Sequence, residues 1–366
     1  MNKISVINGI RGISALWVVI SHCCILGGYT GYNPNAKVAV DIFMMISGFL
    51  MMYTSDYIDI KEPFENKNNW IRFYLRRFFR VSPAYYLALI VAIFLVDYFV
   101  PSFRELALLN NNTVLASIPV DFSAWNILLH ITYTFGFFPK QSFSTLLPDW
   151  SLSLEMQFYL IFPIIFLFFK KTRSLIKITL FTICILLLSV ISKKYFIPHF
   201  LEPSLIFYQM PIFLIGIFIY LGTSKLTVFK KQRIVFLVSA LLLCIYAILT
   251  KDKRDNFYLL FASVLLTICC LENFFSQRIN HFFDNKFFKT LSDLSYSVYL
   301  FHMFFLSIIG AYIERNLYAL GYSPNQCVII IVFTIIPLTY VTAYFLYKYI
   351  ELPGIRLGKI LIKKFK

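Results

Sequence analysis

Charged residues are scarce in this chain of 366 residues: they make up 14% of it, against about a quarter of an ordinary soluble domain. Acidic residues are the rarer sign, with 18 Asp and Glu against 34 Lys and Arg. The sequence is 59% hydrophobic and 19% aromatic, and its mean hydropathy is +0.73. This lack of charge excludes an ordinary soluble domain and indicates a polytopic membrane protein.

Cysteines are also few, at 7 residues, and no two of them have the CxxC spacing of a redox or metal-binding motif. Cys23 and Cys24 are adjacent, as are Cys269 and Cys270, and both pairs lie in apolar runs. We interpret them as small buried hydrophobic residues. The sequence therefore predicts neither a disulfide framework nor a metal site.

Long apolar runs fill most of the chain and predict an all-α polytopic membrane protein. About ten of them approach the ~20 residues needed to cross a bilayer, namely 10–28, 38–54, 83–100, 149–169, 175–192, 205–222, 232–249, 256–273, 291–312 and 326–348. Most Lys and Arg fall in alternate segments between them, and this positive-inside pattern predicts that both termini are cytoplasmic. The net charge of +16 is thus explained by topology and by anionic lipid headgroups, so we expect no nucleic-acid partner.

The first run contains two ionisable residues, Arg11 and His22. On a helix their spacing is three turns, or about 16 Å along one face, which places Arg11 near one membrane surface and His22 past the midplane. A charge at such depth costs at least about 2.5 kcal/mol and usually faces a bundle interior or a watery cavity, which favours a functional role. The alternatives are a snorkelling arginine and a neutral histidine that bonds to a neighbouring helix.

The second run begins with Asp41 near the outer surface and continues through Ser47 and Gly48. For Asp41, contact with a substrate competes with a simple role as a helix N-cap. Ser47 and Gly48 are small residues that permit a close approach between helices.

The fourth run carries Ser151 and Glu155, which are four residues apart and therefore on one helix face. Counted inward from the outer surface, Glu155 lies roughly 9 Å deep, at about the depth of His22. A carboxylate level with a histidine is what a general base and its orienting partner require.

Arginines alternate with aromatic residues just before the third run, and they are Arg72, Arg76, Arg77 and Arg80. One interpretation is an interfacial amphipathic helix whose arginines contact lipid phosphates, and composition alone favours it. The other is a binding site for a polyphosphate ligand, because guanidinium groups pair with phosphate oxygens.

Residues 101–148 form the longest segment expected outside, and within them 125–138 are apolar but too few to span comfortably. We interpret this stretch as an interfacial or re-entrant lid. Its histidine, His130, is interpreted as a solvated surface residue.

The ninth run places His302 near the midplane, with Ser295 two helical turns and Tyr299 one turn before it. We interpret His302 as a structural or positioning residue. The runs between 175 and 273 are nearly free of ionisable residues and are interpreted as scaffold. At the end of the last run, Pro353 predicts a break in the helix.

The ordered set of these motifs resembles the acyltransferase-3 family of bacterial membrane acyltransferases, which includes the O-antigen and exopolysaccharide O-acetylases. The resemblance rests on Arg11 with His22, Phe43 to Phe49, Arg77-x-x-Arg80 before Pro83, Trp150-Ser151-Leu152-x-x-Glu155-x-x-Phe158-Tyr159, Ser295-Tyr296-x-x-Tyr299-Leu300-x-His302 and Glu351-x-Pro353. It covers the whole chain and implies one transmembrane domain over residues 1–366, without the extracytoplasmic esterase-like domain of some relatives. It also implies a multi-pass protein of the bacterial inner membrane.

The resemblance implies transfer of an acyl group, most often acetyl, from cytoplasmic acyl-CoA to a hydroxyl of a surface glycan or its lipid-linked precursor. We expect acyl-CoA as a donor substrate and no permanently bound cofactor. The expected catalytic residues are His22 as the general base, Glu155, Arg11 and His302. Arg77, Arg80 and Arg76 are expected to hold the CoA phosphates, and Asp41, Ser151, Ser295 and Tyr299 to contact the substrate or the oxyanion.

A proton-coupled transporter is the alternative function, because intramembrane Arg, Glu and His residues also mark proton relays. The lack of inverted repeats and of paired Gly/Pro-interrupted helices argues against it.

Overall fold

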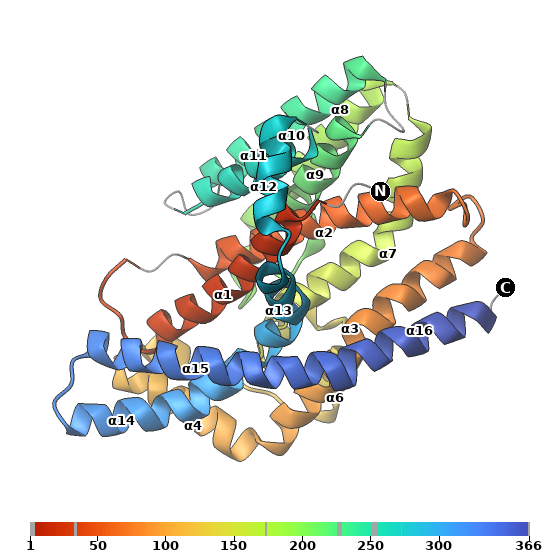
Figure 1. The fold of residues 1–366 in the computed structure, drawn as a ribbon. Coiled ribbons are helices and arrows are strands. Elements are labelled where there is room, and N and C mark those ends of the chain that lie inside the picture. Colours follow the sequence, from red (N-terminus) through yellow and green to blue (C-terminus); the bar gives the residue numbers. More distant parts are fainter. Residues whose placement is uncertain are drawn as a thin grey trace. The chain divides into compact units, whose positions relative to one another are not determined.

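The structure is a computed structural model that describes residues 4–32, 35–172, 174–224, 229–250, 255–271 and 273–364. These residues form helices joined by short connections, with no β-strand among them (Figure 1). Within this described part, 9 helices are long and apolar enough to cross a membrane, and a bent pair makes up to 10. The predicted all-α polytopic fold class is confirmed, whereas the cytoplasmic position of both termini stays a prediction.

The chain divides into two compact units. The first comprises Met1–Gly12, Lys37–Leu75 and Ser151–Ser292, and the second comprises Ile13–Ala36, Arg76–Trp150 and Asp293–Lys366. Residues distant in sequence therefore form each unit. Helices α1 (Val6–Leu26), α3 (Asn68–Phe94) and α13 (Lys286–Phe305) are divided between the units, whereas α2 (Ala36–Asp59) and α7 (Trp150–Lys171) each belong to the first unit except for their first residue.

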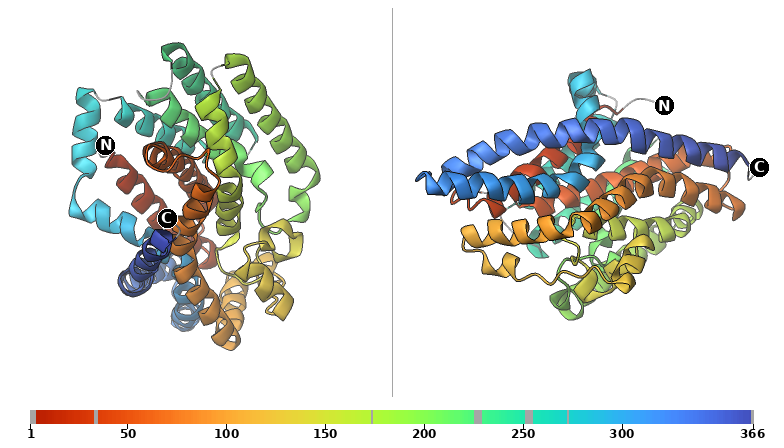
Figure 2. Two further views of the ribbon diagram at one scale, coloured as in Figure 1. Left: turned by 90° about the vertical axis from the view of Figure 1, so that its right-hand side faces the viewer. Right: turned by 90° about the horizontal axis from the view of Figure 1, so that it is seen from below.

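In the first unit, α9 is the central helix. The other helices of this unit are α2 (Ala36–Asp59), α8 (Leu175–Tyr195), the short η3 (Ile197–His199), α10 (Lys230–Thr250), α11 (Phe257–Cys270) and α12 (Phe274–Phe283). α9 (Ile206–Thr223) is 83% buried and packs against α8, α10 and α11, as the ribbon shows for α8 and α10 (Figures 1 and 2). Its aromatic residues extend the core, where Phe213 stacks on Phe158 of α7 with ring centroids 4.2 Å apart.

Two glycines bring α2 and α9 into backbone contact. A Cβ atom at Gly48 would lie 2.1 Å from the carbonyl oxygen of Phe213, and one at Gly216 would lie 1.8 Å from that of Met45. Neither position has room for a side chain. The close helix approach predicted at Gly48 is confirmed.

The second unit contains the remaining parts of α1, α3 and α13 and a series of shorter helices. These are α4 (Val96–Leu109), α5 (Thr113–Ala116), α6 (Ala124–Ile131), η1 (Phe135–Phe137), η2 (Pro139–Gln141), η4 (Leu306–Gly310), α14 (Ala311–Ala319), α15 (Pro324–Leu346), η5 (Tyr347–Glu351) and α16 (Leu352–Lys364). α14 packs against α4 and α15, and the views show α14 and α15 side by side (Figures 1 and 2).

Two π-helical turns join consecutive helices: η4 lies between α13 and α14, and η5 lies between α15 and α16. η5 joins α15 to α16, so the helix continues through Pro353, which lies at the start of α16. The break predicted at Pro353 was therefore wrong. The π turn changes the backbone hydrogen-bond pattern just before the proline, so its missing N–H is accommodated there.

The boundary predicted near residue 83 was also wrong. α3 begins at Asn68 and contains Pro83, so the arginine-rich stretch and the apolar stretch form one continuous helix. It ends at Phe94, and α4 starts two residues later.

Candidate functional site

The second unit brings together two of the histidines that the sequence singled out. Nδ1 of His22, on α1, lies 2.8 Å from Nε2 of His302, on α13. The two ring planes are within 6° of parallel, with centroids 5.1 Å apart. This is a hydrogen-bonded imidazole pair formed by residues 280 positions apart in the chain.

The two rings differ in exposure. His302 is 0% exposed, and its Nδ1 lies 3.2 Å from the carbonyl oxygen of Val298, one turn earlier on α13. His22 is half-buried. Of the two, His22 is therefore the more exposed ring.

Other side chains of α13 hold this helix in place. The hydroxyl of Tyr296 donates a hydrogen bond to the carbonyl of Val81 on α3, at 2.8 Å, and Ser297 donates to the buried carboxylate of Glu351. Ser295 is buried, and the Tyr299 ring lies 6.2 Å from that of His302.

The three arginines expected to bind CoA phosphates, Arg76, Arg77 and Arg80, lie on the part of α3 that belongs to the second unit. Arg80 is exposed and the other two are half-buried. Glycines at 354 and 358 let α16 pack closely on Phe79 of the same stretch. The unit thus carries both the arginines and the imidazole pair.

Glu155 belongs to the first unit, where its carboxylate oxygen Oε1 accepts two hydrogen bonds. Ser47 of α2 donates from 3.0 Å, and Tyr159, one turn further along α7, also donates. Glu155 is half-buried. Its direct partners are therefore two hydroxyl groups, and the expected pairing of Glu155 with His22 stays a prediction.

Arg11, Asp41 and Ser151 also belong to the first unit. Asp41 is 3% exposed and lies in the second turn of α2, which begins at Ala36. The N-cap alternative for Asp41 was therefore wrong. Arg11 and Ser151 are both half-buried, on α1 and α7.

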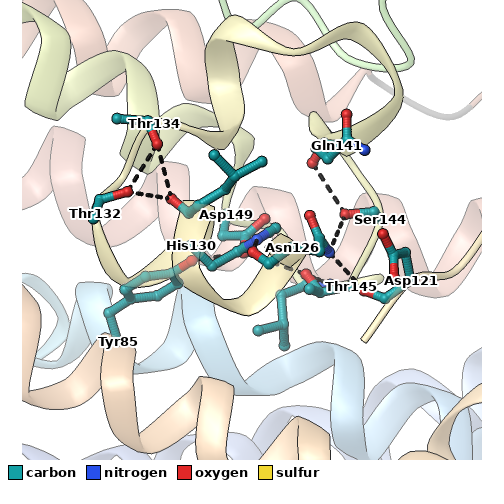
Figure 3. Close-up of polar contacts among 12 residues, drawn as sticks. Tyr85, Asp121, Asn126, His130, Thr132, Thr134, Gln141, Ser144, Thr145 and Asp149 are labelled. Carbon is teal, nitrogen blue, oxygen red and sulfur yellow. Dashed lines mark hydrogen bonds and ion pairs between the residues drawn. The ribbon is translucent and has the colours of Figure 1, made fainter. Parts of the chain in front are cut away.

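Sequence analysis missed a second polar cluster, which surrounds His130 in the second unit (Figure 3). His130 and Asp149 are both 0% exposed, and Nε2 of His130 lies 3.6 Å from Oδ2 of Asp149. Tyr85 of α3 and Thr145 donate hydrogen bonds to the same carboxylate oxygen, from 3.1 and 3.3 Å. The interpretation of His130 as a solvated surface residue was wrong.

Contacts within its own segment also hold the buried ring of His130. Nδ1 of His130 lies 2.8 Å from the carbonyl of Asn126, and the ring stacks on Phe135 with centroids 4.1 Å apart. Burial raises the pKa of the Asp149 carboxyl above its usual value of 3.8, although His130 and Tyr85 act in the opposite direction. Asp149 directly precedes α7, so the cluster fixes the start of the helix that carries Glu155.

One signal in the sequence points to this cluster. Ser123 caps α6 by accepting a hydrogen bond from the backbone N–H of Asn126, and such a cap predicts a short helix that places Asn126 and His130 on one face. No sequence pattern identifies Asp149 as the partner, because the two residues meet only through the folded loop between them.

No group of three or more His, Cys, Asp or Glu residues that could hold a metal ion occurs in the described part of the chain. Among the cysteines, Cys23, Cys244, Cys269 and Cys327 are buried, and all 7 are free thiols.

Comparison with known proteins shows which family the chain resembles in sequence. The sequence model of the acyltransferase-3 family, described as "Acyltransferase domain", matches residues 4–348. The O-acetyltransferase OatA of Staphylococcus aureus strain NCTC 8325 is 24% identical over 95% of this chain and 56% of its own length. A second relative, from S. aureus strain COL, carries the name "Putative O-acetyltransferase SACOL0978". It is 25% identical over 96% of this chain and 57% of its own length.

The chain spans little more than half the length of these curated relatives. No solved structure gives a significant match. The chain is a multi-pass membrane protein and belongs to the acyltransferase-3 family.

Proposed function

We propose that this protein is a membrane O-acyltransferase that moves an acyl group, in the first instance acetyl, from cytoplasmic acyl-CoA to a hydroxyl of a surface glycan or its lipid-linked precursor. The family membership and the O-acetyltransferase names of its relatives support acyl transfer. We place the protein in the bacterial inner membrane, where a cytoplasmic donor and an extracytoplasmic acceptor approach one enzyme from opposite sides.

The single observation that carries the proposal is the contact between His22 and His302. A half-buried imidazole that is held by a fully buried one is suited to general base catalysis, because one of its ring nitrogens can accept a proton and its position is fixed. The pair lies on membrane-length helices, where a polar pair without a function costs stability.

In the proposed reaction, His22 removes the proton of the acceptor hydroxyl as the hydroxyl oxygen attacks the thioester carbonyl. The resulting tetrahedral oxyanion accepts hydrogen bonds from Tyr299 or Ser295. When the carbon–sulfur bond breaks, the thiolate takes the proton from the His22 imidazolium, so the products are the ester and free CoA. A route through an acyl-histidine intermediate uses the same residue as a nucleophile.

The donor is held by Arg77 and Arg80, with Arg76 beside them. A guanidinium pairs with two phosphate oxygens at once, which a lysine cannot do, so an arginine cluster is suited to the phosphates of CoA. The exposure of Arg80 is compatible with a ligand that arrives from water. Arg11 and Glu155 belong to the other unit, so their roles, a neutralising charge for the donor and support of the base, stay predictions from the sequence.

The test uses the purified protein in liposomes with acetyl-CoA labelled in the acetyl group. We expect consumption of acetyl-CoA and release of free CoA that depend on an added glycan acceptor, and loss of both in His22→Gln. A proton-coupled transporter has no reason to consume acetyl-CoA. Transport of a proton or solute by a preparation that leaves acetyl-CoA intact in the presence of surface glycans would refute the proposal.

A matched pair of variants tests the donor site. Arg77→Lys and Arg80→Lys keep the positive charge but lose the bidentate contact, so the KM for acetyl-CoA should rise about tenfold with little change in protein amount. Lys359→Arg is the control: it exchanges one basic side chain for another at an exposed position of α16 in the same unit, and it should leave the KM unchanged. An unchanged KM for acetyl-CoA in both arginine variants would refute the donor site and favour the alternative, in which these arginines contact lipid phosphates.

A further inference from the structure

We infer that His302 fixes the tautomer of His22, so that Nε2 of His22 is the atom that takes the proton from the acceptor hydroxyl. The role in acyl transfer rests on the proposed function, whereas the direction of the hydrogen bonds rests on geometry alone. Sequence analysis gave the orienting role to Glu155.

The direction of the hydrogen bonds is set at Val298. A carbonyl oxygen only accepts hydrogen bonds, so Nδ1 of His302, 3.2 Å away, carries a proton and donates it. His302 is 0% exposed, and a fully buried imidazole is more stable as the neutral ring than as the cation. Nε2 of His302 is therefore unprotonated.

The same rule then applies to the contact between the two rings. Nε2 of His302 accepts a hydrogen bond from Nδ1 of His22, 2.8 Å away. A neutral His22 that carries its proton on Nδ1 has its lone pair on Nε2. The chain of bonds thus runs in one direction, from His22 through His302 to the carbonyl of Val298.

This direction has a chemical consequence. When Nε2 of His22 takes the proton of the acceptor hydroxyl, the ring becomes an imidazolium whose two nitrogens both donate. Its bond from Nδ1 to His302 then becomes charge-assisted and stronger, so His302 stabilises the charge that develops in the transition state. The acidic residue of a catalytic triad accepts a hydrogen bond from the catalytic histidine and orients it without touching the substrate. His302 has the same role here and is therefore a positioning residue.

The direct test is the tautomer itself. The chain has only 5 histidines, so the ¹⁵N signals of histidine-labelled protein in liposomes can be assigned by single substitutions. We expect the signal assigned to His22 to show a protonated Nδ1 and an unprotonated Nε2, and His302→Leu to abolish that preference. A His22 ring protonated on Nε2 in the unsubstituted protein would overturn the inference.

The kinetic test compares two replacements of His302. His302→Gln supplies an amide oxygen that accepts from Nδ1 of His22, whereas His302→Leu fills similar space without an acceptor. We expect His302→Gln to keep kcat within about tenfold and His302→Leu to lose roughly a hundredfold, with an unchanged KM for acetyl-CoA in both. Equal kcat in the two variants would show that volume alone matters and would refute the positioning role.

The control is His199→Gln, because His199 is exposed in η3 and belongs to neither histidine pair. The two tests separate the two hypotheses. If the protein transfers no acyl group but His22 has the expected tautomer, the proposed function fails and the hydrogen-bond direction stands. If transfer occurs and His22 is protonated on Nε2, the function stands and this inference fails.

Discussion

The His22–His302 pair and the His130–Asp149 pair share one local device. In each, a helical histidine directs Nδ1 at the carbonyl four residues earlier, His302 at Val298 over 3.2 Å and His130 at Asn126 over 2.8 Å. The device fixes which nitrogen carries the proton and presents Nε2 to a partner outside the helix.

The pairs differ in the group that Nε2 faces and in the exposure of that group. His302 faces a second imidazole that is half-buried, whereas His130 faces a carboxylate that is as buried as itself. A proton can therefore enter or leave the first pair through His22, and the second pair is enclosed. The comparison shows that fixing the tautomer of a histidine does not by itself decide its role. The histidine is reactive where its partner is exposed and structural where its partner is buried.

The largest expected effect is on the accessible pair. His22→Gln removes the proposed base, so acyl transfer should fall by about 10²- to 10⁴-fold, while the melting temperature stays close to that of the unsubstituted protein. Both are measured on one detergent preparation, with rates normalised to folded protein. Near-normal turnover in His22→Gln, together with an inactive His302→Gln, would move the base to α13 and reverse the roles of the two rings.

The enclosed pair should respond in the opposite way. His130→Leu leaves the buried carboxyl group of Asp149 without its partner, and an unsatisfied buried polar group costs about 1 to 3 kcal/mol of unfolding free energy. We expect a lower melting temperature but normal turnover per folded molecule. His199→Leu, at an exposed position, is the matched control. A stable His130→Leu protein without activity would make His130 catalytic and end the contrast between the pairs.

The sequence identified both residues of the first pair but not their contact, and it identified neither residue of the second pair as a partner. His22 is recognisable because an ionisable residue in a membrane-length apolar run is costly, and the helical order of the runs follows from composition. Its partner His302 was named but not joined to it, because a contact across 280 positions depends on how helices pack. The predicted orienting residue, Glu155, bonds to Ser47 and Tyr159, and its pairing with His22 stays a prediction.

His130 was misjudged for a related reason. A short apolar stretch in a long connection indicates an exposed surface element, and only the folded segment shows that α3 and the Asp149 loop cover it (Figure 3). Pro353 was misjudged because a π turn precedes it, and the helix continues through it as α3 continues through Pro83.

A smaller effect is expected at Glu155, and it sharpens the assignment of the partner of His22. Glu155→Gln keeps an oxygen that accepts from Ser47 and Tyr159 but removes the charge, so we expect turnover to fall about tenfold, less than in His22→Gln. Ser47→Ala, which removes one donor to Glu155, should lose no more than that. A loss in Glu155→Gln as large as in His22→Gln would favour Glu155 over His302 as the essential partner of the base.

The smallest effect concerns the protonation of the enclosed pair. Because burial raises the pKa of Asp149 above 3.8, the folded protein binds this proton more tightly than the unfolded chain does. The unfolded state therefore binds fewer protons in the window just above 3.8, and stability falls as the pH rises through it.

Asp149→Asn removes this titration. Its melting temperature, relative to that of the unsubstituted protein, should therefore increase as the pH rises from about 4 to about 7. A rising trend means that Asp149 carries the proton and that the His130 pair is neutral, as the His22 pair is inferred to be. A falling trend would mean that an ion pair holds the segment, and the two pairs would then differ in charge as well as in access.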